Sequence, residues 1–592
     1  MSPLRLVARI VRRVLTRGEK LRVALLGVLV LANVGLEMLG LGLFIPTLAL
    51  LTSDNAVADL RGAWGPFGSM SDLAIVLAGL GILVAVFLVK NAVGLLIAWY
   101  QRTAIARMSV RLTTDLFERY MRQPYEFHKQ SNSSVLIRNV QNAYLVVTDG
   151  IGAIMSLATD GLVAVGILAV LMVVEPTGTA LVAAVFVVLA WVLQRTTRSR
   201  IGRLGAERNQ HNAQMLRRQQ QGLSAVKEII VSGRRDRFLV EHDRHVEGMH
   251  MANRTYGFLQ QVPRAWMEIV TVVGLAILIL VVVAQGRDPG DALPILGLFG
   301  VAAFRVQPSI MRMMISVQSL TYSRAVIQTF HDDFLMPVVA EGGDGAIPRL
   351  SSEIRLVGLG FQYEDRGAPV LAGVDARIAR GEKIGIIGAS GSGKSTLVDL
   401  LLGVVVPTEG RILVDGADVT TGVGSWQRQI GYVPQEIYLL DDTIGRNVAF
   451  GAELDAPTLA AVWDALAAAQ LADFVRGLPD GIDTMVGERG VRLSGGQRQR
   501  IGIARALLGD PAVLVFDEAT SALDSTTELG VLDAIRSASR DKTVVAVAHR
   551  PSTLADCDRL WRVSDGGIVD LGRPTESLLR SLADVTDEQE AG

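Results

Sequence analysis

Cysteine and unbalanced charge are what this sequence most clearly lacks. Its 592 residues include a single cysteine, Cys557, which excludes a fold held together by intrachain disulfides. The 58 basic and 59 acidic residues leave a net charge of −1, so no overall field favours a nucleic-acid partner. Hydrophobic residues, in contrast, make up 50% of the chain. They gather before about residue 325, and the remainder has the composition of a soluble domain. The length allows two or more domains.

Long apolar runs predict six membrane-spanning helices in the first part of the chain. A helix needs about 20 apolar residues to cross the ~30 Å hydrocarbon core of a bilayer. The first run is too long for the apolar core of a cleaved signal peptide, although basic residues precede it. The candidate spans cover about residues 22–51, 73–100, 143–174, 177–194, 258–285 and 291–318.

The long loops between these spans are rich in arginine, which predicts their side of the membrane. Because basic loops mark the cytoplasmic side, we expect both termini and both long loops inside the cell. Residues 102–122 and 195–227 keep helical periodicity while becoming charged, which indicates helices that continue beyond the bilayer. We expect cytosolic turning points near 124–134 and 222–228, and tight outer turns near 175–176 and 286–290.

The second part of the chain alternates strand-like and helix-like segments, the pattern of an α/β domain. A loop-rich segment, 341–348, precedes it. We therefore expect a helical membrane domain over 1–322, a linker over 323–351, a soluble α/β domain over 352–583 and a tail over 584–592.

Residues 388–395 have the sequence GASGSGKS and match the P-loop pattern G-x-x-x-x-G-K-S. A strand-like apolar run precedes them and a helix-like run follows, so backbone N–H groups and a helix N-terminus can surround a phosphate. Lys394 is expected to reach the β- and γ-phosphates of ATP, and the Ser395 hydroxyl to ligate Mg²⁺. The expected nucleotide contacts are Gly388, Ser390, Gly391, Ser392, Gly393, Lys394, Ser395 and Thr396.

Two acids end the apolar run 513–518, which reads as a buried strand. Asp517 suits Mg²⁺, directly or through water, because hard cations prefer oxygen ligands. Glu518 can polarise the attacking water as a general base. Such a run is weak evidence alone, but it is strong when a P-loop precedes it.

Residues 493–497, LSGGQ, predict a second phosphate-binding helix N-terminus. Its contacts would be the hydroxyl of Ser494, the N–H groups of Gly495 and Gly496, and Gln497. One chain has no need of two such cradles at one nucleotide. The motif makes sense if it closes over the ATP held by another copy of the chain.

Together these motifs resemble the ABC transporters, in the exporter-type half transporter that fuses a membrane domain to an ATPase domain. The resemblance implies an ATPase coupled to transport by a homodimer, with two cytosolic turns acting as coupling helices. It implies a bacterial inner-membrane protein with its ATPase domain in the cytoplasm. It further implies an adenine-stacking role for Tyr363, a Mg²⁺ and water contact for Gln435, a dimer-interface role for Asp524, a γ-phosphate contact for His549, and contact of 486–490 with the cytosolic turns.

Ionisable residues inside the apolar spans predict a polar interior for the membrane domain. Each costs about 2.5–3.5 kcal/mol at a helix centre, so lipid-facing placement is unfavourable. Arg264 and Glu268 could neutralise each other at i, i+4, and Lys90 and Arg312 could reach the inner boundary. A basic, water-filled cavity for an anionic substrate is the preferred interpretation. The residues expected in the cavity are Glu37, Lys90, Arg264, Glu268, Arg305 and Arg312, with Asp160 as a further acid.

The membrane half also resembles the PglK-type flippases of lipid-linked oligosaccharides. The resemblance rests on Glu37 and Pro46, on the 262–268 stretch, on the 304–312 stretch, and on the polar positions 132–133 and Lys90. It implies a polyprenyl-pyrophosphate substrate. A lipid or lipopolysaccharide-core flippase and a multidrug or peptide exporter remain alternatives, although the last two spans contain few aromatic residues for a drug cavity. A channel gated by ATP is a further alternative, whereas a non-transport ATPase is excluded by six spans.

Overall fold

The computed structural model describes residues 3–52, 71–285, 289–337, 345–363, 367–519, 525–548 and 550–579. It divides into two compact units: Met1–Met121 with His128–Val338, and Arg122–Phe127 with Val339–Gly592. The first unit is helical, as expected for a membrane domain, and the second is an α/β domain. Part of the expected linker, residues 324–334, forms a helix that belongs to the first unit.

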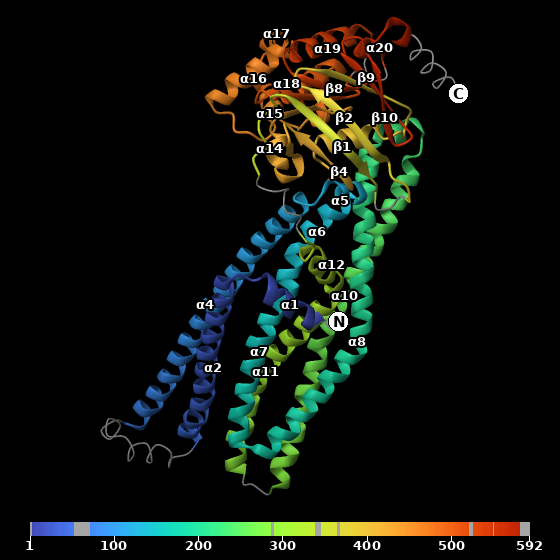
Figure 1. Cartoon of the computed structure of the whole chain (residues 1–592). Coiled ribbons are helices and arrows are strands. Elements are labelled where there is room, and N and C mark those ends of the chain that lie inside the picture. Colours follow the sequence, from blue (N-terminus) through green and yellow to red (C-terminus); the bar gives the residue numbers. More distant parts are fainter. Residues whose placement is uncertain are drawn as a thin grey trace. The chain divides into compact units, whose positions relative to one another are not determined.

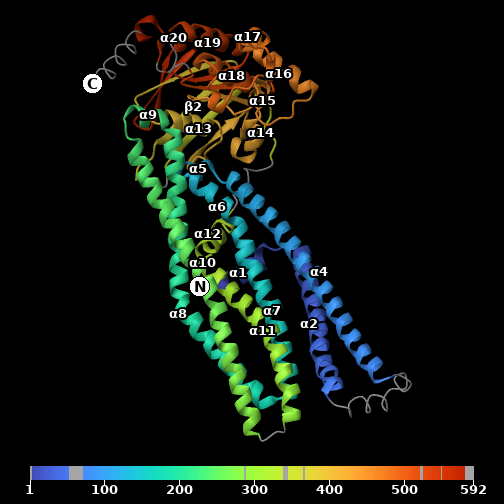
Figure 2. The ribbon, with the colours of Figure 1, turned by 180° about the vertical axis from the view of Figure 1, so that it is seen from behind.

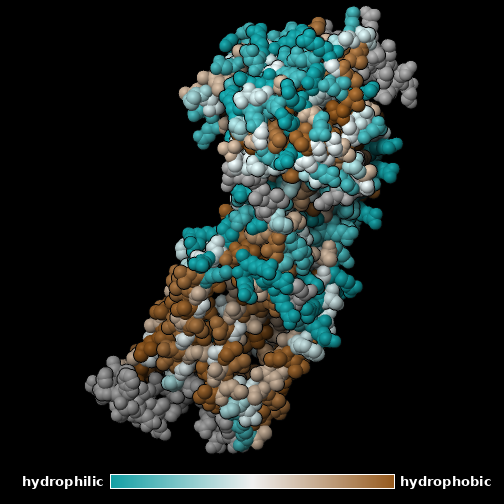
Figure 3. Space-filling model, in the orientation of Figure 1, coloured by the Kyte–Doolittle hydropathy of each residue, from teal (hydrophilic) through white to brown (hydrophobic). Residues whose placement is uncertain are grey.

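The helical unit is built from long apolar helices that run side by side in Figures 1 and 2. Helix α2 packs along α4, α7 along α11, and α8 along α10. Figure 3 shows apolar side chains covering much of the surface of these helices. The helices of this part of the chain are α1 (Pro3–Val14), α2 (Arg17–Thr52), α4 (Asp72–Met121), α5 (Tyr125–Gln130), α6 (Ser133–Leu145), α7 (Ala153–Val174), α8 (Pro176–Ser224), α9 (Val226–Val231), α10 (Arg235–Ala284), α11 (Pro289–Tyr322) and α12 (Arg324–Phe334). The first half of α5 is counted with the second unit.

Five helices in the described part of the chain are long and apolar enough to cross a membrane. The sixth predicted span, 291–318, falls within α11, where the side chains of 289–295 lie outside the described residues. Helices α4, α8 and α10 contain 50, 49 and 50 residues. At 1.5 Å per residue each is about 75 Å long, far more than a bilayer requires. The expected helices that continue past the apolar spans are present as single helices.

Short helices mark both predicted cytosolic turning points. Helix α5 lies between α4 and α6, and α9 lies between α8 and α10. The tight turn expected before α8 is present: the Glu175 side chain accepts a hydrogen bond from the Gly178 N–H, and Pro176 occupies the first helical turn, where its missing N–H costs nothing. Residues 286–288 of the other outer turn lie outside the described residues.

The helix through the third predicted span differs from the expectation over 143–174. It begins ten residues earlier, because Asn132 caps α6 by accepting a hydrogen bond from the Ser134 N–H. It then passes through a π-helical segment, Val146–Gly152, before α7. Within this segment the Asp149 carboxylate accepts a 2.6 Å hydrogen bond from the Ser323 hydroxyl at the end of α11. Apolar periodicity carries no signal of this interruption.

Helices α8 and α11 approach each other closely at Gly205. A Cβ atom there would lie 1.9 Å from the carbonyl oxygen of Tyr322, so only glycine fits. The Tyr322 ring stacks on Tyr256 of α10 at 3.8 Å, and its hydroxyl donates a 2.6 Å hydrogen bond to Asn253. These contacts fix three helices to one another near the end of α11.

Two sheets form the frame of the α/β unit. The four-stranded antiparallel sheet has the order β2-β1-β4-β5, and the six-stranded sheet has the order β10-β9-β3-β8-β7-β6. In the larger sheet β3 and β6 to β9 are parallel, and β10 is an antiparallel edge. The strands are β1 (Glu353–Phe361), β2 (Leu371–Ala379), β3 (Lys383–Ile387), β4 (Glu409–Val414), β5 (Ala417–Asp418), β6 (Ile430–Val433), β7 (Val513–Asp517), β8 (Thr543–Val547), β9 (Arg559–Ser564) and β10 (Gly567–Gly572).

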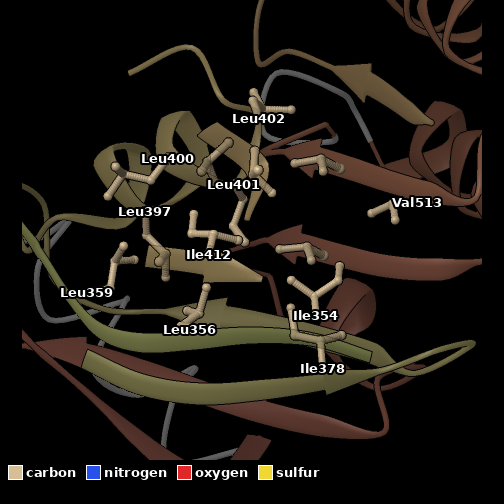
Figure 4. Packing of buried hydrophobic residues seen from close by; sticks show 14 of the residues in the cluster. Ile354, Leu356, Leu359, Ile378, Leu397, Leu400, Leu401, Leu402, Ile412 and Val513 are labelled. Carbon is tan, nitrogen blue, oxygen red and sulfur yellow. The ribbon is translucent and has the colours of Figure 1, made fainter. Parts of the chain in front are cut away.

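Helix α13 (Lys394–Leu401) is held between the two sheets by an apolar core. Figure 4 shows Ile354 and Leu356 of β1 gathered against Leu397 and Leu401 of α13. This packing fixes the helix that follows the P-loop. The remaining helices of the unit are α14 (Val423–Gln427), α15 (Ile444–Ala449), α16 (Ala456–Ala468), α17 (Ala472–Arg476), α18 (Gly495–Leu507), α19 (Ser525–Ala538) and α20 (Pro551–Leu554).

The close approach at Gly205 generates a stability prediction. Gly205→Ala is expected to lower the thermal midpoint of the purified protein by several degrees, because overpacking a tight contact costs about 1–3 kcal/mol. Gly222→Ala is the matched control: it lies in the same helix, with nothing within 4 Å of the added methyl group. Alanine is the better helix former, so this control should keep or slightly raise the midpoint. Equal midpoints for the two variants would contradict the described packing.

Candidate functional site

The P-loop joins β3 to α13 through backbone geometry that glycine supplies. Gly393 precedes α13 with φ 107°, a left-handed conformation that other residues rarely adopt. A Cβ on Gly388 would lie 2.5 Å from the Val563 carbonyl oxygen of β9. The loop can therefore curve tightly above the sheet and turn its N–H groups inward.

Lys394 lies at the centre of this loop. Its ammonium donates hydrogen bonds of 2.8 Å to the Gly388 carbonyl and 3.0 Å to the Ala389 carbonyl. Burial lowers the pKa of Lys394, while the nearby Glu518 and Asp517 carboxylates raise it. The Ser392 hydroxyl is buried in the same loop and has no hydrogen-bond partner among the described residues. A cation and an unsatisfied buried hydroxyl fit a phosphate group of ATP.

Two adjacent carboxylates face the loop from the end of β7. Burial, followed by the neighbouring Glu518 charge, raises the pKa of Asp517. The Tyr432 hydroxyl donates a hydrogen bond to Asp517, and burial raises the pKa of that tyrosine. Carboxylate and hydroxyl oxygens are the ligand type that Mg²⁺ prefers, so Asp517 and Ser395 fit that ion. Tyr432 was missed by sequence reasoning, since an aromatic residue in a strand carries no signal of its own.

Glu518 adopts a strained backbone conformation immediately after β7. Its φ of 49° is left-handed, which costs a non-glycine residue about 1–2 kcal/mol. The Glu518 N–H donates a 2.9 Å hydrogen bond to the Val547 carbonyl, and this contact holds the residue in place. The Gln435 amide donates a 2.7 Å hydrogen bond to the Glu518 carboxylate. Gln435 follows β6 and Glu518 follows β7, and both are predicted site residues. The structure therefore brings the two together.

The LSGGQ segment begins α18 through a capping box. The Ser494 hydroxyl accepts from the Gln497 N–H at 3.3 Å, and the Gln497 side chain accepts from the Ser494 N–H at 2.8 Å. Gly495 and Gly496 form the first turn. The hydrogen bonds of the described residues that involve Ser494 and Gln497 side chains are made within this first turn.

Of three other expected nucleotide contacts, the structure describes only Tyr363. The Tyr363 hydroxyl lies 3.2 Å from the Thr396 hydroxyl, and its ring meets Phe361 edge to face at 4.8 Å, beside the P-loop helix. Asp524 and His549 lie outside the described residues. Their roles remain predictions.

The charged residues of the membrane unit form ion pairs between helices. The Glu37 carboxylate of α2 lies 2.6 Å from the Lys90 ammonium of α4 and 3.4 Å from Arg305 Nε of α11. Both cations lie over the ring of Phe87, at 5.4 Å for Lys90 and 5.0 Å for Arg305. The Glu37 side chain is 7% exposed and that of Arg305 is 33% exposed. Phe87 was missed, since a phenylalanine in an apolar span has no distinguishing pattern.

The other charged residues pair separately. Arg312 lies 2.7 Å from the buried Asp160 of α7 and donates to the Ser309 hydroxyl at 3.3 Å. Arg264 pairs with Glu268 at 3.6 Å, as their i, i+4 spacing allows, and both side chains are more than 60% exposed. The structure therefore brings Glu37, Lys90 and Arg305 together and leaves the Arg264–Glu268 pair apart from them.

A P-loop ATPase domain joined to long membrane helices defines an ABC exporter, and the chain belongs to the ABC transporter family. The family model for the ABC transporter ATPase matches residues 371–521, and the model for the ABC transporter transmembrane region matches residues 23–304. The P-loop, Glu518 and the LSGGQ segment lie within the first match, and Glu37, Lys90 and Asp160 lie within the second.

The chain is also similar to individual ABC exporters. The chain is 31% identical to an ATP-dependent lipid A-core flippase of Ralstonia nicotianae and 30% identical to one of Cupriavidus pinatubonensis, with 80% of each chain covered in both cases. It is 43% identical to an ATM1-type heavy metal exporter of Novosphingobium aromaticivorans over 37% of this chain and 36% of that one. A solved bacterial Atm1-family ABC exporter with ATP bound shares the fold with a TM-score of 0.77 at 24% identity, covering 98% of this chain and 99% of the other. The protein is therefore a multi-pass membrane exporter that couples ATP hydrolysis to transport.

The hydrogen bond from Gln435 to Glu518 leads to a prediction about hydrolysis. Glu518→Gln keeps the shape of the side chain and removes the base. It should bind ATP and lower the hydrolysis rate by at least about a hundredfold, measured as phosphate release. Glu453→Gln, the same change at an exposed residue, is the control and should match the unaltered protein. Wild-type turnover in Glu518→Gln would exclude the assignment.

Proposed function

We propose that this exporter flips an anionic lipid-linked substrate, a polyprenyl-pyrophosphate-linked oligosaccharide, across the bacterial inner membrane. The observation that carries the proposal is the surplus positive charge around Glu37. One carboxylate there faces two cations, Lys90 and Arg305, so the cluster keeps a net charge of +1 within the membrane. A mid-membrane charge is costly, and an anionic substrate would compensate it.

Arg305 is the cation in this cluster that can reach a substrate. Lys90 holds the shorter contact with Glu37 and is 8% exposed, whereas Arg305 holds the longer contact and is 33% exposed. A guanidinium presents a fork of donors matched to phosphate oxygens. Arg312 and Arg264 are compensated by Asp160 and Glu268. We therefore assign the principal phosphate contact to Arg305, with Arg312 as a second contact. We expect Arg264 to contribute less to substrate binding.

A lipid A-core flippase is the second candidate function. It is favoured by relatives that carry this name over 80% of the chain, and its substrate is also an anionic lipid. The two candidates share the phosphate contact and differ in the lipid and the glycan attached to it. A multidrug or peptide exporter receives no comparable support from the charged cluster.

We propose that the working unit is a homodimer with two composite ATP sites. The P-loop of one copy and the Ser494 helix N-terminus of the other would hold one ATP, because a single site has no need of two phosphate-binding helix N-termini. Mg²⁺, when bound, would neutralise charge on the β- and γ-phosphates. Glu518 accepts a proton from the attacking water, whose oxygen bonds to the γ-phosphorus as the bond to ADP breaks. Gln435 orients Glu518. Closure and release of the two ATPase domains would then alternate access to the lipid site.

A complementation experiment tests the composite site. Lys394→Ala removes the P-loop cation. Ser494→Asp keeps a good helix cap and places a negative charge against the phosphate. Neither homodimer should hydrolyse ATP. Random mixing of the two chains should restore roughly a quarter of the wild-type rate, since half of the dimers are mixed and each has one intact site.

Size measurement of the mixed sample shows whether the dimer has formed. An inactive mixture of confirmed dimers, or an ATPase-active monomer, would contradict the composite site.

Removal of Arg305 separates a binding role from a structural one. Arg305→Ala leaves Glu37 paired with Lys90, so the thermal midpoint should change little while flipping of a lipid-linked oligosaccharide into proteoliposomes falls at least about tenfold. Lys90→Ala removes the closer partner of a buried acid and should destabilise the protein by about 3–5 kcal/mol. Arg264→Ala, on an exposed pair, should have the smallest effect on flipping. Loss of stability together with flipping in Arg305→Ala would favour a purely structural role.

A further inference from the structure

We propose that a groove between α8 and α12 binds the phosphate-bearing head group of a lipid at the cytoplasmic boundary of the membrane. We call it the arginine groove; it is lined by Arg195, Arg198, Arg203 and Arg324, with Gln194 and Trp191 at one end. The inference builds on the proposed function, because such a site would collect the anionic lipid before it reaches Arg305.

The groove is formed by matching faces of two helices. Residues 191, 195, 198, 202 and 206 of α8 recur at spacings of three and four, so they share one helix face. Residues 321, 324, 325 and 328 repeat the pattern at the junction of α11 and α12. The space between these faces has a volume of about 850 Å³. Gly205 and Tyr322 hold the two elements at a fixed separation beside it.

Its lining carries positive charge without compensation. Four arginines line the groove and no acidic residue does. Among the described residues, none of these arginines forms a salt bridge, unlike Arg218 further along α8, which pairs with Glu241 at 2.7 Å. Arg195 lies 5.6 Å from the centre of the Trp191 ring, which holds its guanidinium near the groove. A surplus of four cations in one concave surface favours an anion with several oxygens, such as a phosphate or pyrophosphate.

A buried donor in the lining supports the same ligand. The side-chain nitrogen of Gln194 is buried and has no hydrogen-bond partner within the described structure. A buried donor without a partner costs about 1–3 kcal/mol, which an acceptor oxygen of a ligand would recover. The four guanidinium groups and this amide nitrogen are all donors, so they match an acceptor group of a ligand.

The position of the groove favours a lipid over a soluble phosphate. The apolar span of α8 ends at residue 194, and Arg195 follows at once. Trp191 is 60% exposed, and tryptophan is enriched at membrane–water interfaces. Basic pockets between helices on the cytoplasmic side are suited to anionic lipid heads. The groove thus lies where a head group sits while its tail stays in the bilayer.

The test measures equilibrium binding of tritiated geranylgeranyl pyrophosphate to the full-length protein in detergent. All samples carry Arg305→Ala, which removes the central contact, and saturating Mg-ADP, which blocks the P-loop. Adding Arg195→Ala and Arg198→Ala should raise the dissociation constant at least about tenfold, because two charge-assisted contacts are lost. Arg195→Lys with Arg198→Lys preserves charge and should weaken binding less.

Arg200→Ala is the matched control, since it removes an exposed arginine of the same helix that does not line the groove. It should leave the dissociation constant within about twofold. An equal loss in this control, or no binding in the Arg305→Ala background, would overturn the proposal. Inorganic pyrophosphate should compete poorly; competition as strong as that of the lipid would mean that the groove recognises soluble phosphate. Groove-dependent binding without any flipping would leave this site standing while contradicting the proposed function.

Discussion

The constraint on which the membrane unit depends is that a carboxylate buried among apolar helices needs a cation. Glu37 is 7% exposed, and it draws Lys90 of α4 and Arg305 of α11 to one point on α2. The contact therefore links three helices and fixes their rotation. Because one acid cannot neutralise two cations, the same contact that orders the helices leaves a positive charge inside the membrane. The ion pairs of Glu37 thus account both for the packing of these helices and for the proposed preference for an anionic substrate.

In the ATPase domain, the predicted site residues are positioned by an unusual backbone conformation and by a helix cap. Glu518 is held in a left-handed conformation at the end of a buried strand, where Gln435 contacts it. Ser494 and Gln497 satisfy each other at the start of α18, so two N–H groups of its N-terminus are hydrogen-bonded within the chain. In the proposed homodimer, a second copy would bring the two halves of the composite site together.

Local patterns explain why much of the architecture could be predicted. The P-loop, the acids after β7 and the LSGGQ helix start each occupy a few consecutive residues, and spans and helical extensions follow from hydropathy and periodicity. The contact of Arg264 with Glu268 likewise follows from i, i+4 spacing.

Contacts between distant segments explain what could not be predicted. Arg305 and Arg312 share a helix face, yet the structure gives them acids from different helices, Glu37 of α2 and Asp160 of α7. The aromatic partners Phe87 and Tyr432 and the π-helical segment Val146–Gly152 also depend on neighbours remote in sequence.

Native mass spectrometry of the lipid that co-purifies with the dimer tests the central claim most directly. The account predicts a bound lipid with the mass of a polyprenyl pyrophosphate carrying a glycan, present in the unaltered protein and depleted in Arg305→Ala. A bound lipid of the lipid A type would change the identity of the proposed substrate but would be consistent with the assigned phosphate contact. Neutral or zwitterionic lipids alone, unchanged by loss of Arg305, would contradict the account.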